Sequence, residues 1–169
     1  MSNSVLILSD MFGVNDKSEY LKKTLYFFDK LGFSCDMLST PEYCGINNYY
    51  KEKDIHTEFT ERGIDIGVYK LSKNSSKYDI AIGFSIGGTI LWKSIKQGFN
   101  VPKILCFSPS RLRFESGKIM TESHIALSDE EHFKYHFDKS LYDYLYIEKS
   151  SNHDFYKGIS LEKFLKNLL

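Results

Sequence analysis

Residues 78–88 read YDIAIGFSIGG, and this stretch decides the fold. The apolar run 78–84 is typical of a strand that is buried on both faces of a parallel sheet. Ser85 follows it directly, and residues 89–97 have the pattern of a helix. The unit therefore places a Gly-x-Ser-x-Gly pattern, Gly83 to Gly87, between a strand and a helix, which is the context of a nucleophilic serine.

The residue types around Ser85 fit that chemistry. A serine on a sharp strand-to-helix turn projects its hydroxyl from the end of the sheet, and flanking glycines allow backbone to approach too closely for any Cβ. The N-terminus of the following helix offers N–H donors to a developing oxyanion. The alternative is a serine that only caps an ordinary helix.

The rest of the chain alternates short apolar runs with amphipathic segments. This pattern predicts one α/β domain over residues 1–169, with a mostly parallel sheet of five or six strands and helices on both faces. Residues 54–71 are expected to be helical, although Gly63 and Gly67 weaken a helix there. The other expected strands are 5–9, 33–38, 101–107, 124–127 and 144–147, and the other expected helices are 20–31, 129–137 and 161–169.

Composition excludes several classes of protein. Lys+Arg and Asp+Glu both number 22, so the formal net charge is 0 and nucleic-acid binding is disfavoured. No apolar stretch is long enough for a membrane span or a signal peptide. Three cysteines without a C-x-x-C pair predict neither a disulfide framework nor a zinc site, and no metal or other cofactor is expected. We therefore expect a cytoplasmic protein.

A serine nucleophile needs a histidine base and an acid, each following a later strand. Asp129 comes directly after the expected strand 124–127, and His153 lies on the loop after the last strand. We therefore predict the triad Ser85, His153 and Asp129. The acids Glu122, Asp138 and Asp143 remain alternatives to Asp129.

Two backbone N–H groups are expected to form the oxyanion hole. Ile86 follows the nucleophile at the start of a helix and supplies one of them. The other should come from a loop after an early strand, and the loop 9–13 places the N–H of Met11 there.

Four stretches together resemble the α/β-hydrolase superfamily, and within it the dienelactone hydrolase-like branch. They occur in the order of the family and span most of the chain: LSDMFGVN (8–15), GFSIGG (83–88), IALSDEE (125–131) and SNHDF (151–155). The resemblance assigns Ser85, Asp129 and His153 to the triad and the Met11 N–H to the oxyanion hole. The chain departs from dienelactone hydrolases by carrying serine where they carry cysteine. It also lacks room for a lid domain, and the two leading antiparallel strands of the full fold are not found.

The resemblance implies a small serine hydrolase that cleaves a carboxylic ester or thioester. A non-catalytic module that binds an acyl compound or a protein partner is the alternative, and an acyltransferase is a third reading. An exposed sheet edge could also support a homodimer. Five further side chains could border the site: Tyr43, Tyr49, Tyr50, Arg111 and Arg113.

Overall fold

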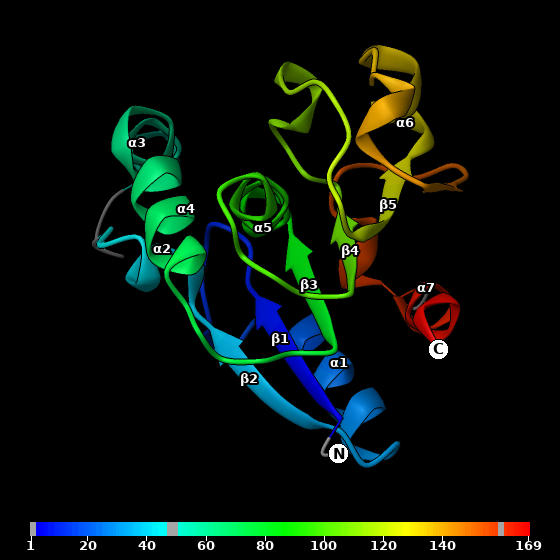
Figure 1. Cartoon of the computed structure of the whole chain (residues 1–169). Coiled ribbons are helices and arrows are strands. Elements are labelled where there is room, and N and C mark those ends of the chain that lie inside the picture. The colour runs from blue at the N-terminus through cyan, green and yellow to red at the C-terminus, as the bar shows by residue number, and fades with distance from the viewer. Residues whose placement is uncertain (1–2, 47–50, 159–160) are drawn as a thin grey trace.

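A six-stranded parallel sheet forms the centre of the molecule (Figure 1). The computed structural model describes residues 3–46, 51–158 and 161–169. The strand order is β2-β1-β3-β4-β5-β6, and every neighbouring pair is parallel. The strands are β1 (Ser4–Leu8), β2 (Ser34–Leu38), β3 (Ile80–Phe84), β4 (Lys103–Phe107), β5 (Glu122–Ser128) and β6 (Tyr144–Glu148). The predicted parallel α/β sheet is confirmed, with six strands.

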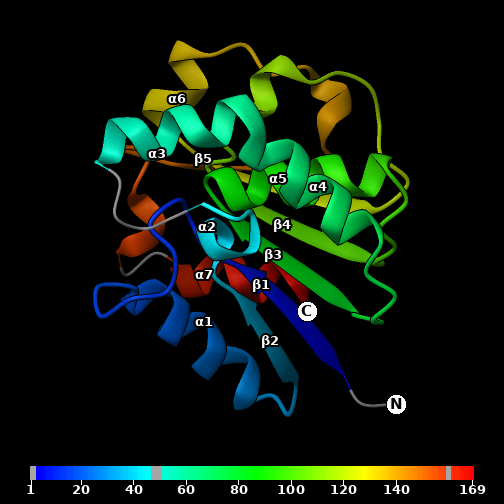
Figure 2. The ribbon, with the colours of Figure 1, turned by 90° about the vertical axis from the view of Figure 1, so that its left-hand side faces the viewer.

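Helices cover both faces of this sheet (Figure 2). Helices α1 and α7 lie on one face, and α3, α4 and α5 lie on the other. A short α2 follows β2, and α6 follows β5 at the carboxyl end of the strands. The helices are α1 (Glu19–Asp29), α2 (Thr40–Tyr43), α3 (Glu52–Glu58), α4 (Ile64–Ser72), α5 (Ile86–Lys96), α6 (Asp129–Lys134) and α7 (Leu161–Leu165). One-turn helical segments occur at 112–114, 139–141, 155–157 and 166–168.

Strand order places two loops side by side. The chain enters the sheet at β1, next to the edge, moves outward to the edge strand β2, and returns to β3 on the other side of β1. Leu8 at the end of β1 is therefore paired with Gly83 near the end of β3. Ligands of open parallel sheets bind at such a reversal, outside the carboxyl ends of the strands.

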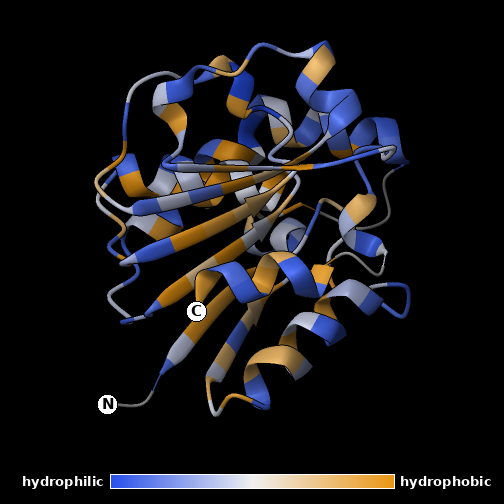
Figure 3. Cartoon of the chain, turned by 90° about the vertical axis from the view of Figure 1, so that its right-hand side faces the viewer, coloured by the Kyte–Doolittle hydropathy of each residue, from blue (hydrophilic) through white to orange (hydrophobic). Residues whose placement is uncertain are grey.

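The inner strands of the sheet are mostly apolar (Figure 3), and β3 is buried along its whole length. On β3, Ile82 and Phe84 pack in the cluster beneath α1 and α7, whereas Ala81 packs in the cluster beneath α4 and α5. Burial on both sides explains why this strand is a continuous apolar run rather than an alternating one. Two cores thus hold the sheet between its helical layers.

The helical prediction for residues 54–71 is confirmed, since α3, a π-helical turn (Phe59–Gly63) and α4 follow one another without a break. Gly67 lies inside α4 because of packing. A Cβ added there would be 2.7 Å from the Cys44 sulfur and 3.1 Å from Cδ1 of Ile90. The glycine allows α4 to approach its neighbours closely instead of ending the helix. No helix in the described ranges is both long enough and apolar enough to cross a bilayer.

Candidate active site

Ser85 occupies a strained turn between β3 and α5. Its φ is 51° and its ψ is −118°, a combination that residues other than glycine rarely adopt. The turn is held on both sides: the Ser85 N–H donates to the Phe107 carbonyl at 2.8 Å, and the Ser85 carbonyl accepts from the Thr89 N–H at 3.2 Å. The surrounding hydrogen bonds therefore fix a conformation that the residue would not choose alone.

Two glycines make this turn sterically allowed. A Cβ added to Gly87 would lie 2.3 Å from the carbonyl oxygen of Ser9, and one added to Gly83 would lie 2.5 Å from Cα of Gly88. Both contacts are with backbone atoms, which cannot move aside cheaply. The Gly-x-Ser-x-Gly pattern thus has a physical cause in this chain, because β1, β3 and α5 meet more closely than any side chain permits.

His153 reaches Ser85 from the loop that follows β6. Its Nε2 lies 2.9 Å from the Ser85 Oγ. The Ser85 residue is 6% exposed, while the His153 side chain is 39% exposed. The structure thus brings together the serine and the histidine that the sequence paired, although they are 68 residues apart.

Glu131, rather than Asp129, contacts the imidazole. Its Oε1 lies 2.7 Å from Nδ1 of His153. Asp129 instead accepts the backbone N–H groups of Ser150 at 2.7 Å and Ser151 at 3.1 Å. The predicted contact between Asp129 and His153 is therefore replaced: Asp129 holds the backbone of the histidine loop, and Glu131 holds the ring.

The cause is the N-terminal geometry of α6. Ser128 is the N-cap residue of α6, and Glu131 is its third helical residue. The Ser128 side chain accepts the Glu131 N–H, while the Glu131 carboxylate accepts the Ser128 N–H, which is a capping box. This arrangement folds Glu131 back toward the sheet, where His153 lies. The sequence does contain the signal, since Ser-x-x-Glu at 128–131 is the capping-box pattern.

The other acids considered have partners elsewhere. Asp138 accepts the Ser140 N–H at 2.9 Å, Asp143 accepts the Ser123 hydroxyl at 3.0 Å, and Glu122 lies 2.7 Å from Nε2 of His124. Asp138 is thus occupied by a local hydrogen bond, and Asp143 by a hydrogen bond to Ser123 on β5. Glu122 belongs to a second histidine–glutamate pair.

Glu131 remains a carboxylate in this setting. Burial raises the pKa of its carboxyl group, but hydrogen bonds from His153 and Ser108, together with the charge of the histidine, outweigh burial and lower the pKa. An ionised carboxylate can only accept, so Nδ1 of His153 must carry the proton. In the neutral ring Nε2 is then an acceptor, and the Ser85 hydroxyl donates to it.

The two expected oxyanion donors border the same pocket. Met11 and Ile86 line a pocket of about 540 Å³ together with Ser85 and His153. Ile86 begins α5, so its N–H has no acceptor within the helix. Asp10 shapes the Met11 loop by accepting the Phe12 N–H at 3.0 Å.

Helix α3 forms part of the pocket wall. The remaining lining residues combine apolar and polar side chains: Glu52, Lys53, His56, Phe59 and Ser110. Arg113 lines an adjoining pocket of about 440 Å³ that shares His56, Ser110 and His153 with the first. Tyr43 packs against the core, and Arg111 lies over the Phe114 ring. Tyr49 and Tyr50 lie outside the described residues.

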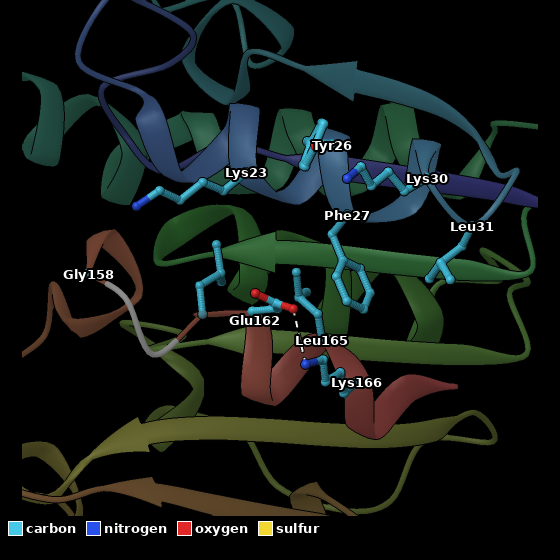
Figure 4. A pocket seen from close by; sticks show the side chains of 10 residues that line it. Lys23, Tyr26, Phe27, Lys30, Leu31, Gly158, Glu162, Leu165 and Lys166 are labelled. Carbon is cyan, nitrogen blue, oxygen red and sulfur yellow. Dashed lines mark ion pairs between the residues drawn. The ribbon is translucent and has the colours of Figure 1, made fainter.

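A larger hollow of about 730 Å³ lies between α1 and α7, apart from Ser85 (Figure 4). Phe27, Leu161 and Leu165 contribute apolar surface, and Glu162 pairs with Lys166 at 3.1 Å on its rim. Its lining residues within the described ranges include no serine, cysteine or histidine, so its size alone does not make it a candidate site for a serine or cysteine nucleophile. The described part of the chain contains no group of three or more His, Cys, Asp or Glu residues placed to bind a metal ion.

Comparisons with known proteins identify the fold. No protein-family model and no curated protein matches the chain. Among solved structures, a predicted CIB-like hydrolase from Thermoplasma acidophilum is similar at a TM-score of 0.68 and 14% identity, covering 98% of this chain and 84% of that one. A dienelactone hydrolase from Anabaena variabilis is similar at a TM-score of 0.56 and 10% identity, covering 99% and 83%.

A thioesterase domain, NocB from the nocardicin cluster, is similar at a TM-score of 0.51 and 12% identity, covering 92% and 87%. Identities this low establish the fold alone. The chain therefore has the α/β-hydrolase fold, as the four sequence stretches predicted.

Proposed function

We propose that this chain, built on the α/β-hydrolase fold, is a serine hydrolase that cleaves a carboxylic ester or thioester through the triad Ser85, His153 and Glu131. One observation carries the proposal: a continuous hydrogen-bond chain joins the strained serine to a buried carboxylate, with 2.9 Å from Ser85 to His153 and 2.7 Å from His153 to Glu131. This is the geometry that turns a weakly nucleophilic hydroxyl into a reactive one.

Acylation would start at the hydroxyl. As Oγ of Ser85 attacks the substrate carbonyl carbon, Nε2 of His153 takes the hydroxyl proton, and Glu131 stabilises the imidazolium that forms. The carbonyl oxygen becomes an oxyanion, which the N–H groups of Met11 and Ile86 would bind. When the intermediate collapses, the bond to the alcohol or thiol breaks, and the leaving group takes the proton from Nε2.

Deacylation would repeat the sequence with water. A water molecule attacks the acyl carbon while Nε2 takes one of its protons. The second intermediate collapses with release of the carboxylic acid, and Ser85 regains its proton from His153. Each proton taken by the ring is returned, so the triad ends the cycle unchanged.

Three observations support a nucleophilic serine over a serine that only caps a helix. Ser85 has the strained φ of 51°, its side chain makes no capping hydrogen bond to α5, and its hydroxyl borders a pocket. An ordinary N-cap serine has extended backbone and accepts an N–H from the first helical turn. Ser128 does this at the start of α6, where its φ is −70°.

A fluorophosphonate probe tests the proposal directly. We expect labelling of the wild type at Ser85, identified by mass spectrometry, and none in Ser85→Ala. A panel of short- and long-chain esters and thioesters should show turnover by the wild type that Ser85→Ala loses. Adding acceptor alcohols distinguishes hydrolysis from acyl transfer. An unlabelled, inactive wild type would refute the proposal and favour a binding module.

A further inference from the structure

Ser108 lies beside the triad without contacting the pocket. It follows β4, the strand next to β3, and it is completely buried. Its φ is 41°, so it shares with Ser85 a conformation that side chains rarely adopt. Its Oγ lies 2.6 Å from Oε2 of Glu131, which is the shortest hydrogen bond that this carboxylate makes.

The hydrogen bonds of Glu131 are divided between its two oxygens. Oε2 accepts the hydroxyl of Ser108 at 2.6 Å, the hydroxyl of Ser128 at 3.1 Å and the N–H of Ser128 at 3.2 Å. Oε1 accepts Nδ1–H of His153 at 2.7 Å. One oxygen is thus anchored to the protein, and the other is left for the imidazole.

We propose that Ser108 is a positioning residue for the triad: its hydroxyl holds Oε2 of Glu131 so that Oε1 faces His153. The proposal rests on the function proposed above. Rotation about the last bond of a glutamate side chain is broad, so a carboxylate held only from one side can turn. Ser128 holds it from the helix cap, and Ser108 holds it from the sheet.

The backbone around Ser108 joins the nucleophile to the acid. The carbonyl of Phe107, the residue before Ser108, accepts the Ser85 N–H at 2.8 Å, and the Ser108 N–H donates to the Ala126 carbonyl at 2.8 Å. The β3–β4–β5 hydrogen bonds therefore continue through both strained serines. These hydrogen bonds therefore fix the position of Ser108 relative to Ser85.

Two substitutions separate the hydroxyl from the backbone. Ser108→Ala removes the hydroxyl but keeps a side chain at positive φ, whereas Ser108→Gly removes the hydroxyl and relieves the strain. We expect both variants to lose about tenfold in kcat on a 4-nitrophenyl ester, with KM within about twofold of the wild type. Their thermal midpoints should differ, with glycine the more stable.

Ser123 supplies a matched control. It is 1% exposed, lies on β5, and donates its hydroxyl to the Asp143 carboxylate at 3.0 Å. Ser123→Ala therefore deletes another serine–carboxylate hydrogen bond, a partly buried one, at the opposite end of the sheet. It should lower the thermal midpoint without changing kcat.

The ¹⁵N NMR signals of the His153 ring provide a readout that needs no substrate. The wild type should show the tautomer protonated at Nδ1, and both Ser108 variants should show a mixture of tautomers. The proposal would be overturned if Ser108→Ala and Ser108→Gly both kept wild-type kcat and wild-type His153 ring signals. It would also be overturned if the loss of kcat were larger in the variant with the lower thermal midpoint, because the loss would then reflect stability. A wild type without turnover or fluorophosphonate labelling would refute the hydrolase, while the ring signals would still decide whether Ser108 positions Glu131.

Discussion

Two histidine–glutamate pairs lie at opposite ends of the sheet and differ in what surrounds them. In each pair a ring nitrogen lies 2.7 Å from a carboxylate oxygen: His153 with Glu131, and His124 with Glu122. The other nitrogen of His153 faces the Ser85 hydroxyl beside a pocket. The other nitrogen of His124 is bound to the Tyr146 hydroxyl at 2.9 Å.

In the second pair, both ring nitrogens of His124 have hydrogen-bond partners. The His124 ring stacks on Tyr144 with centroids 4.6 Å apart, and Glu122 also pairs with Lys103 at 3.3 Å. A histidine–carboxylate contact is therefore not enough for catalysis. What distinguishes the His153 pair is one ring nitrogen that faces the Ser85 hydroxyl at the edge of a pocket.

Removing each histidine in turn should give the largest difference between the pairs. His153→Ala should lower kcat by about 10⁴-fold or more, because Ser85 loses the base that takes its proton. His124→Phe keeps a stacked ring and should retain kcat. Steady-state rates on an activated ester measure both effects.

The His124 variant still has a structural cost. Loss of its hydrogen bonds should destabilise the fold by about 1 kcal/mol, which lowers the thermal midpoint by roughly 2–4 °C. A large loss of kcat in folded His124→Phe would remove the distinction between the two pairs and open the assignment of the base again.

Substitution of the two glutamates should give the next largest difference in kcat. Glu131→Gln preserves shape but can place its amide group, a donor, against His153, which favours the wrong tautomer. We expect kcat to fall by about 10²–10⁴-fold. Glu122→Gln is the matched change in the other pair and should leave kcat within about twofold. Equal activity of Glu131→Gln and the wild type would exclude Glu131 from the triad.

Asp129 should have a smaller effect, because it acts on the loop backbone. Asp129→Asn keeps one oxygen that can accept an N–H but loses the charge that binds both Ser150 and Ser151. We expect kcat to fall by no more than about tenfold. A loss as large as that of Glu131→Gln would mean that Asp129, and not Glu131, holds His153 during turnover.

The different roles of Asp129 and Glu131 show how far the site could be predicted from the sequence. The turn at Ser85 could be predicted because strand, glycines, serine and helix are contiguous, and each has a local physical requirement. Asp129 and Glu131 follow the same strand two residues apart, so chain spacing cannot separate them. The direction in which each side chain leaves the first turn of α6 decides, and the capping box at Ser128 fixes that direction.

Other features depend on contacts that no local pattern encodes. Ser108 looks like an ordinary loop residue in the sequence, and only the adjacency of β4 and β5 brings it to Glu131. Gly67 counts against a helix in the sequence because glycine has a low helix propensity. The reason for the glycine is the close approach of Cys44 and Ile90, which are distant in the sequence. The sheet was easier to predict, because strands buried on both faces carry continuous apolar runs.

The smallest expected difference between the two pairs is in how the free energy of unfolding changes at acidic pH. The pKa of the Glu131 carboxyl group is lowered in the fold, because hydrogen bonds from His153 and Ser108 outweigh the opposing effect of burial. A lowered folded-state pKa contributes stability above the unfolded value, roughly 4.3, and this contribution disappears as pH falls through the folded-state pKa. Hydrogen bonding to His124 likewise lowers the pKa of Glu122, but its side chain is 43% exposed, so solvent screens most of that contribution.

Urea unfolding at pH 6 and pH 3 measures this difference. The wild type should exceed Glu131→Gln in the free energy of unfolding at pH 6. The gap should shrink toward pH 3, below the unfolded-state pKa of roughly 4.3, because the unfolded chain then binds the proton more readily than the folded one. Glu122→Gln should show a smaller gap at pH 6 and therefore a smaller change. If the Glu122 gap proved the more pH-dependent, the network around His124 would be the stronger electrostatic contact despite the exposure of Glu122.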